Sequence, residues 1–315
     1  MTPGAATADS ETGQPQAADP EVAESAGADV TGGPVPAARP PAVVAAFEGW
    51  NDAGDAATGA VEHLELTWDA RLLTEIDPED FYDFQVNRPT VTLVEGVTRR
   101  LTWPTTLLSV CRPPGSDRDI LLIRGIEPNM RWRAFCTELL DICTDLGADQ
   151  FVWLGALLAD TPHTRPVPVT GTSYDSESAA RFGTDQSRYE GPTGIIGVLQ
   201  DECVKAGVPA VTFWAALPHY ISQGPHPMAT LALLHRIEEV LDMPVPVGAL
   251  PQQAEEWQRM VDETASEDEE ITEYVRRLEQ KAGTPQLRHT SGESLAQEAE
   301  RYLRRRGPGS GSDGP

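Results

Sequence analysis

Histidine and aspartate side chains, which could transfer protons or bind a metal ion, gather in two proline-rich segments of the chain. One segment contains Asp160 and His163, and the other contains His219 and His226. Neither segment has the HxH or HExxH spacing that would bring two histidines to one metal ion. A loop histidine held by one hydrogen bond to the backbone is the more common case. We therefore expect no metal ion and no catalytic residue here, and we retain His163 and His219 as candidate contacts to a ligand or a partner.

Acidic and amide side chains also follow the first apolar run of the sequence, in the segment EGWNDAGD (48–55). Asn51 or Asp52 can cap the helix expected next, and the two glycines permit a tight turn. A helix N-terminus behind glycines can bind an anion, but this segment is neither GxGxxG nor GxxxxGK, and its acids would repel phosphate. The loop therefore either caps and packs a helix or contacts a ligand or a partner. The candidate contacts in it are Glu48, Asn51, Asp52 and Asp55.

An arginine stands where another helix is expected to begin. Arg131 falls near the positive end of that helix, where the helix dipole disfavours a cation. Such a departure from a local rule can mark a functional site. An acidic neighbour, namely Asp52, Asp55 or Glu127, would relieve it, as would another subunit or a bound anion. A structural salt bridge is the alternative, and Asn129 and Arg131 are the candidate contacts in this loop.

Glycines also precede a third expected helix, in the segment YEGPTGII (189–196). Glycine allows the backbone to approach a ligand or another subunit closely. Ordinary packing of the helix against a sheet explains the same glycines, and both interpretations stay open.

Several classes of enzyme are excluded by residues that the chain lacks. The only lysines are Lys205 and Lys281, and neither lies in a glycine-rich loop, so a Walker A site or a pyridoxal Schiff base is not expected. The sequence has no GxSxG nucleophile elbow, and none of its cysteines lies in an electropositive loop. We expect no cofactor, and we consider an enzymatic activity the less favoured interpretation.

The charge of the chain limits its partners. Its 24 Lys and Arg residues against 49 Asp and Glu residues give a formal net charge of −25. This excess of acid argues against binding to nucleic acid or to an anionic membrane surface, both of which require clustered cations. No apolar window reaches the roughly 20 residues of a membrane helix, and no signal peptide is apparent. With four cysteines expected to be buried and reduced, the prediction is a cytoplasmic protein.

Apolar runs and helical stripes alternate along the middle of the chain, which predicts an α/β fold with a mostly parallel sheet and helices on both faces. Ligands of such sheets lie at the carboxyl ends of the strands, where the loops described above would meet. The expected strands are 42–47, 72–76, 107–111, 120–124, 151–156 and 210–215, with a hairpin formed by 91–94 and 97–103. The expected helices are 52–68, 131–146, 193–206 and 227–241.

The two ends of the chain differ from the middle. Residues 1–40 form an acidic tail rich in Ala, Pro and Gly that cannot bury enough apolar surface to fold, so we expect it to be disordered. We place the α/β core domain at 41–250 and a charged helical extension at 251–306, where Ser266 and Glu269 fit a capping box. Residues 307–315 are expected to be a flexible tail.

Five ordered segments resemble the proteasome assembly chaperone 2 family, and in particular its actinobacterial-type members of unknown function. The segments are AFEGWNDAGDAAT (46–58), EPNMRWRAFCTEL (127–139), WLGALLADTPHTRPVPVTGTS (153–173), YEGPTGIIGVL (189–199) and AALPHYI (215–221). The resemblance implies a three-layer α/β/α fold like that of phosphorylases and hydrolases. It also implies a non-catalytic, homo-oligomeric protein that binds other proteins in a chaperone-like role, with a proteasome or a related ring as the candidate partner.

Two features of the resemblance leave open a function other than binding to a proteasome or a related ring. Some archaeal relatives end in a hydrophobic-Tyr-any motif that inserts into a partner ring, whereas here residues 304–315 follow Tyr302 and Leu303. Docking by that route is therefore not expected. The fold implied by the resemblance is also used by nucleoside-binding enzymes, so the alternative is a protein or enzyme that binds a nucleoside or an anion.

Overall fold

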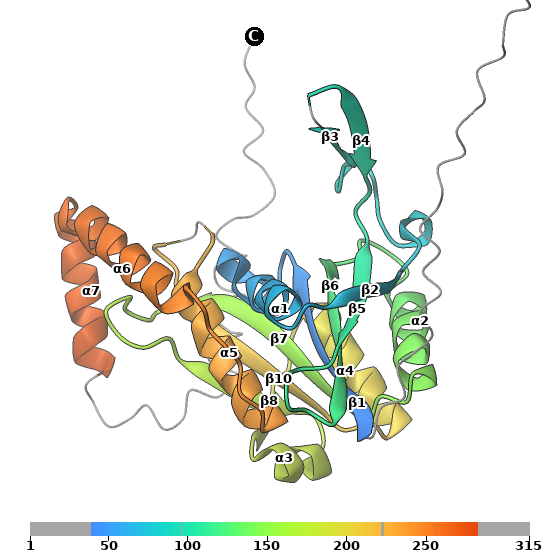
Figure 1. The fold of residues 1–315 in the computed structure, drawn as a ribbon. Helices are drawn as coiled ribbons and strands as arrows, with labels where there is room; N and C mark the ends of the chain where they lie inside the picture. Colours follow the sequence, from blue (N-terminus) through green and yellow to red (C-terminus); the bar gives the residue numbers. More distant parts are fainter. Residues whose placement is uncertain (1–38, 95, 222–223, 283–315) are drawn as a thin grey trace, which may run out of the picture. The chain divides into compact units, whose positions relative to one another are not determined.

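An eight-stranded mixed sheet forms the centre of the computed structural model, which describes residues 39–94, 96–221 and 224–282 (Figure 1). The strand order is β2-β5-β6-β1-β7-β10-β8-β9. The four central strands, β6, β1, β7 and β10, are parallel, whereas β5 and β8 run antiparallel to their central neighbours and β2 runs antiparallel to β5. The sheet strands are β1 (Arg39–Glu48), β2 (Arg71–Glu75), β5 (Thr106–Cys111), β6 (Arg118–Ile126), β7 (Gln150–Ala159), β8 (Val169–Ser173), β9 (Asp185–Gln186) and β10 (Ala210–Pro218).

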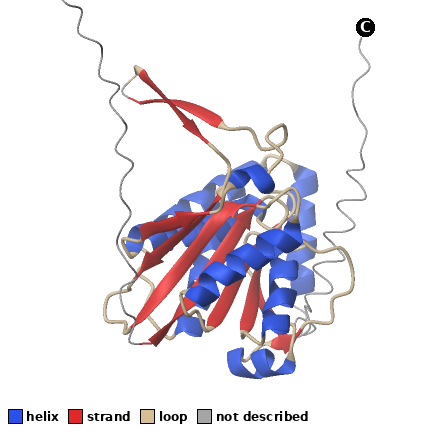
Figure 2. Ribbon diagram, turned by 90° about the vertical axis from the view of Figure 1, so that its right-hand side faces the viewer, coloured by secondary structure: helices blue, strands red, loops and turns tan. Residues whose placement is uncertain are grey.

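Helices cover both faces of this sheet, as the apolar runs of the central strands require. Along β1, Val44 faces a core shared with α1 and α5, while its neighbours Val43 and Ala45 face a second core shared with α2 and α4. Figure 2 shows helices on the two sides of the strands. The three-layer α/β/α architecture is therefore confirmed. These four helices are α1 (Ala56–Thr67), α2 (Trp132–Asp145), α4 (Ile195–Ala206) and α5 (Pro227–Leu241).

The segment between β7 and α4 contains elements that the sequence did not predict. In it, β8 and β9 lie at one edge of the sheet, and α3 (Ser176–Phe182) joins them. The sequence of β8, VTGTS, has no run of large apolar residues, and α3 has only 7 residues. The local signals are a cap, since the Asp175 side chain accepts a hydrogen bond from Ser178 N at 2.7 Å, and the left-handed Gly183 that ends the helix.

Two amphipathic helices, α6 (Leu250–Ser266) and α7 (Glu269–Ala282), form the predicted helical extension. The proposed capping box differs from the observed cap. Because α6 continues to Ser266, that hydroxyl donates to the carbonyl of Glu263 at 2.7 Å, and Asp268 instead caps α7 by accepting from Glu270 N at 2.8 Å. No helix in the described ranges is both long enough and apolar enough to cross a membrane. Of the tail predicted at 1–40, residues 1–38 lie outside the described residues, whereas Arg39 and Pro40 begin β1, because the strand continues beyond its apolar run. Residues 283–306 of the predicted extension and the predicted tail at 307–315 also lie outside the described residues.

A separate two-stranded hairpin, β3 (Thr90–Val94) and β4 (Thr98–Thr102), confirms the predicted hairpin. It pairs with itself and not with the eight-stranded sheet. Every residue of both strands is exposed. In Figures 1 and 2 the hairpin extends away from the main sheet.

Candidate functional site

Three segments meet at the carboxyl ends of the central strands, where the sequence places its candidate residues. Asn51, in the loop after β1, donates from Nδ2 to Oε1 of Glu127, in the loop after β6, at 2.7 Å. The backbone N of Ile195, the first residue of α4, donates to the same oxygen at 2.8 Å. Because the residue before Ile195 is a glycine without a capping side chain, the Glu127 carboxylate satisfies the α4 N-terminus. The backbone of Glu48 joins this junction, since its carbonyl accepts from Glu127 N at 3.1 Å.

Gly194 makes this junction possible. A Cβ atom at Gly194 would lie 2.2 Å from Oδ1 of Asn51, so any side chain there would displace the asparagine. Asn51 is only 1% exposed, and its backbone carbonyl accepts from Ala156 N at 2.8 Å. Its Oδ1 atom has no hydrogen-bond partner within the described residues. The glycine before α4 therefore serves close packing of one loop against a helix.

Asp52 acts on α1 from inside the same loop. Its side chain accepts from Ala57 N at 2.6 Å and from Thr58 N at 3.0 Å, and the Thr58 hydroxyl donates to it as well. Burial raises the pKa of Asp52, and the hydrogen bonds from Thr58 and Ala57 oppose that rise. Asp55, at the end of the loop, is exposed and lies against Gly224. A Cβ atom placed on Gly224 would lie 2.2 Å from Oδ2 of Asp55. Asp52 is thus a helix cap.

Arg131 and Asn129 hold a surface segment. Arg131 pairs with Asp80 at 2.5 Å, and its guanidinium lies 5.8 Å from the centre of the Phe81 ring. The pairing partners expected from sequence were Asp52, Asp55 or Glu127, whereas Asp80 belongs to the 3-10 turn η2 (Pro78–Asp80), which the helical and strand periodicities do not indicate. Both side chains of the pair are exposed, so its contribution to stability is small. In the same region, Asn129 Oδ1 accepts from Asp83 N at 2.8 Å.

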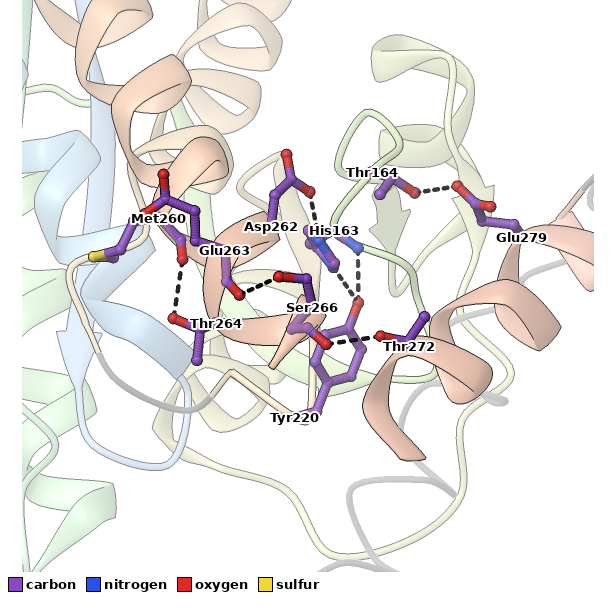
Figure 3. A network of polar contacts seen from close by, with 11 residues as sticks. His163, Thr164, Tyr220, Met260, Asp262, Glu263, Thr264, Ser266, Thr272 and Glu279 are labelled. Carbon is purple, nitrogen blue, oxygen red and sulfur yellow. Dashed lines mark hydrogen bonds and ion pairs between the residues drawn. The ribbon is translucent and has the colours of Figure 1, made fainter. Parts of the chain in front are cut away.

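Both histidine-bearing loops contact the C-terminal helices, and Figure 3 shows these contacts for the loop after β7. His163, only 4% exposed, has Nδ1 at 2.7 Å from the Tyr220 hydroxyl and Nε2 at 3.0 Å from Oδ1 of Asp262 on α6. The hydroxyl of Thr164 donates to Glu279 on α7 at 2.6 Å. One loop after β7 therefore contacts both helices of the extension.

A second set of contacts involves His219 and Asp160. The ring nitrogen Nδ1 of His219 lies 3.3 Å from Oδ1 of Asp160, which also accepts from the Tyr274 hydroxyl of α7 at 2.5 Å. The rings of His219 and Tyr274 meet edge to face at 5.3 Å between centroids. Burial raises the pKa of Tyr220 to about 12, so its hydroxyl stays protonated at neutral pH. The sequence predicted that these two loops lie close together. It did not predict their partners on α6 and α7, because no local sequence pattern indicates those contacts.

His226, the third histidine of these loops, caps α5. Its Nδ1 accepts from Ala229 N at 3.2 Å, and its ring packs against Trp257 of α6 at 4.0 Å between centroids. Burial lowers the pKa of His226 to about 4, so the imidazole is neutral at physiological pH. No group of three or more His, Cys, Asp or Glu side chains in the described part of the chain is arranged to hold a metal ion.

The sequence model of the PAC2 family matches residues 46–265. The chain belongs to the PAC2 family. Residues 46–265 contain all the junctions described above except those made by α7, and the five segments noted in the sequence lie within the same range. The resemblance to the proteasome assembly chaperone 2 family is therefore confirmed.

Solved structures support this membership of the PAC2 family. The Mycobacterium tuberculosis proteasome-assembly chaperone homologue Rv2125 is 62% identical over 74% of this chain and 99% of its own, with a TM-score of 0.69. A PAC2 family protein from Streptomyces avermitilis is 57% identical over 75% of this chain and 99% of its own, with a TM-score of 0.71. PbaB of Pyrococcus furiosus, an archaeal proteasome activator, is 15% identical over 73% of this chain and 96% of its own and shares the fold, with a TM-score of 0.58. Among curated proteins, no match to this chain was found.

Proposed function

We propose that this PAC2 protein is a non-catalytic, homo-oligomeric, chaperone-like protein that binds other proteins, with a proteasome or a related ring as its candidate partner. The observation that carries the proposal is the 62% identity to the Mycobacterium tuberculosis protein described as a proteasome-assembly chaperone homologue, across 99% of that chain. The two structures share their fold, with a TM-score of 0.69. We place its action in the cytoplasm, because its four buried cysteines are free thiols, which suit a reducing compartment.

The polar groups at the strand ends support a binding role over catalysis. In an open α/β enzyme this edge of the sheet receives the substrate. Here Asn51, Glu127 and the α4 N-terminus bond to one another, and Asp52 bonds to the α1 N-terminus. Apart from Asn51 Oδ1, these polar groups are thus already engaged within the chain. The acids at this edge also disfavour an anionic ligand, which weakens the small-molecule alternative.

Affinity purification followed by mass spectrometry, from cells that produce the protein, tests the proposal directly. We expect proteasome subunits or a defined set of other proteins to copurify with the tagged chain and to be depleted from a tag-only control. Binding of purified 20S proteasome, measured by light scattering, tests the named partner. A chain that copurifies with nothing and remains monomeric would refute the proposal. A thermal-shift screen with phosphate, nucleosides and nucleotides tests the alternative, because a ligand of the native state raises the melting temperature.

A further inference from the structure

His226 is the most deeply buried histidine of the described chain, at 1% exposed. Its ring packs against Trp257 of α6 at 4.0 Å between centroids. On its other side, the backbone N of His226 donates to the carbonyl of Gly54 at 2.9 Å. The residue is therefore enclosed by the loop after β1, the first turn of α5 and α6.

This enclosure leaves no place for a second proton on the ring. Nδ1 accepts from Ala229 N at 3.2 Å, so a proton on Nδ1 would point at another N–H and abolish the cap. Nε2 then carries the hydrogen of the neutral ring, and it has no hydrogen-bond partner among the described residues. A buried imidazolium with neither N–H satisfied is much less stable than one in water. Protonation therefore favours a state in which the ring reaches water.

Charged side chains nearby do not offset this cost. Helix α5 has no charged residue in its first two turns. Burial of the ring lowers the pKa of His226 from 6.5 to about 4. The charged residues beside Gly54 and Trp257 in the sequence form no hydrogen bond to the ring within the described chain; they are Asp52, Asp55, Glu255, Glu256 and Arg259.

Of the three elements around the ring, α6 is the one least tied to the body of the protein. The loop after β1 and α5 both contribute side chains to the core that the sheet shares with α1. Leu250, at the start of α6, is only partly buried against that core. The other apolar residues that α6 buries belong to neither core of the sheet; they are Ala254, Trp257, Val261 and Ala265.

The linker before α6 provides a pivot. Val245 is buried in the core, and the carbonyl of Pro246 lies 2.8 Å from Nε2 of His63 on α1, so the linker is fixed up to that point. Gly248 follows in a left-handed conformation, with a φ of 53°, and α6 begins at Leu250. Rotation about residues 247–249 would lift Trp257 from His226 without disturbing the sheet.

We propose that His226 is an acid-sensitive switch whose protonation releases α6 and α7 from the α/β body. Release would also break the bonds that Asp262 and Glu279 make to the loop after β7, so both histidine-bearing loops would become accessible. The switch goes beyond the proposed function and does not depend on the identity of the partner.

Proton linkage sets the size of the effect. A released His226 with its ordinary pKa of 6.5 binds a proton more tightly than the enclosed residue, whose pKa is about 4. The released state should therefore gain up to about 25-fold in population, relative to the attached state, between pH 7.5 and pH 5. A proton on His163 would act in the opposite direction, because it would strengthen the contact with Asp262.

Hydrogen exchange of the full chain, measured at pH 7.5, 6 and 5 and corrected for the intrinsic effect of pH on exchange, tests the switch. Residues 250–282 should open more as the pH falls, while β1 and β7 remain protected. His226→Asn retains a capping side chain but has no proton to gain, so it should lose most of this rise. His235→Asn removes an exposed histidine from the same helix and should keep the wild-type response.

A reversible tether tests the same movement without changing His226. The hydroxyl of Thr164 and the carboxylate of Glu279 lie 2.6 Å apart, and the native cysteines are buried (Figure 3). A short cleavable bis-maleimide should join Thr164→Cys to Glu279→Cys within one chain. With the tether intact, residues 250–282 should stay protected at pH 5, and cleavage should restore the response to acid.

Nuclear magnetic resonance checks that Trp257 is the cover. One histidine signal, absent from His226→Asn, should titrate well below the others and should move towards 6.5 in Trp257→Ala. An unchanged titration in Trp257→Ala would overturn the proposal. So would a response to acid that is absent from the wild-type chain or persists in His226→Asn or in the tethered chain. Opening confined to the first turn of α5, or shared equally by β1 and β7, would also overturn it, and none of these results bears on copurification of partner proteins.

Discussion

Oε1 of Glu127 accepts hydrogen bonds from Asn51 Nδ2 at 2.7 Å and from the backbone of Ile195 at 2.8 Å, so a single carboxylate joins two loops and a helix. Glu127→Ala should therefore leave a buried amide and a helix N–H without partners. The free energy of unfolding should fall by about 1–3 kcal/mol. Urea denaturation followed by circular dichroism measures this loss. Glu255→Ala, which removes an exposed acid from α6, is the matched control, and an equal effect of the two substitutions would contradict the role given to Glu127.

The contact between Gly194 and Asn51 predicts strong coupling between two substitutions. Gly194→Ala alone should be destabilising, because its Cβ would meet Asn51 Oδ1 at 2.2 Å. In an Asn51→Ala background the same change should cost less, because the obstructing amide is gone. A double-mutant cycle on the free energy of unfolding should give a coupling of about 0.5–3 kcal/mol. Additive effects would show that the glycine is needed for another reason.

The contacts of His163 predict a local loosening of the C-terminal helices. Asp262→Ala or His163→Ala should free α6 and α7 from the loop after β7, because the bond at 3.0 Å is lost. Hydrogen exchange should then rise in residues 250–282 while β1 and β7 stay protected. Arg259→Ala, on the same helix without a bond to this loop, is the control. Uniform loss of protection across the sheet would mean that these helices are required for the whole fold.

His226 predicts a dependence of stability on pH with a definite sign. Burial lowers its folded pKa from 6.5 to about 4, so the unfolded chain binds the extra proton between these values. Stability from this group is complete above pH 6.5 and is lost as the pH falls towards 4, by about 3 kcal/mol in total. His226→Asn retains a capping side chain but cannot be protonated in this range. Urea denaturation at pH 7.5 and pH 5 should therefore show a smaller loss for the variant, and an equal loss would refute the assignment.

Sequence reasoning located most elements of the fold because their signals are local. Helix α5 was predicted at its observed bounds, since proline begins it and the apolar stripe continues to Leu241. The edge elements β8 and α3 were missed, because β8 is recognised only by its antiparallel pairing with β10. The prediction of a mostly parallel sheet agrees with the four parallel central strands, but it did not say which strands run antiparallel, because strand direction is decided by connections and not by the residues of each strand.

The candidate site was predictable in its members but not in their partners. The loops with Asn51, Arg131, His163 and His219 were all identified from capping residues, helix starts and clustered side chains. Their partners Asp80, Asp262 and Tyr274 lie far away in the sequence, on segments whose residues carry no mark of the contact. A contact role for the eight candidate residues towards a ligand or another protein stays a prediction, which the proposed experiments address.

The central place of β1 affects how the chain is made. This strand is synthesised first among the described elements, yet its two neighbours in the sheet, β6 and β7, end at residues 126 and 159. Its continuous run of apolar residues therefore leaves the ribosome well before anything can pair with it. Sheets built from such distant pairings fold slowly and expose apolar strands while they wait. Synthesis in a heterologous host should be sensitive to temperature for this reason, with more of the chain recovered in native form when elongation and folding are both slowed.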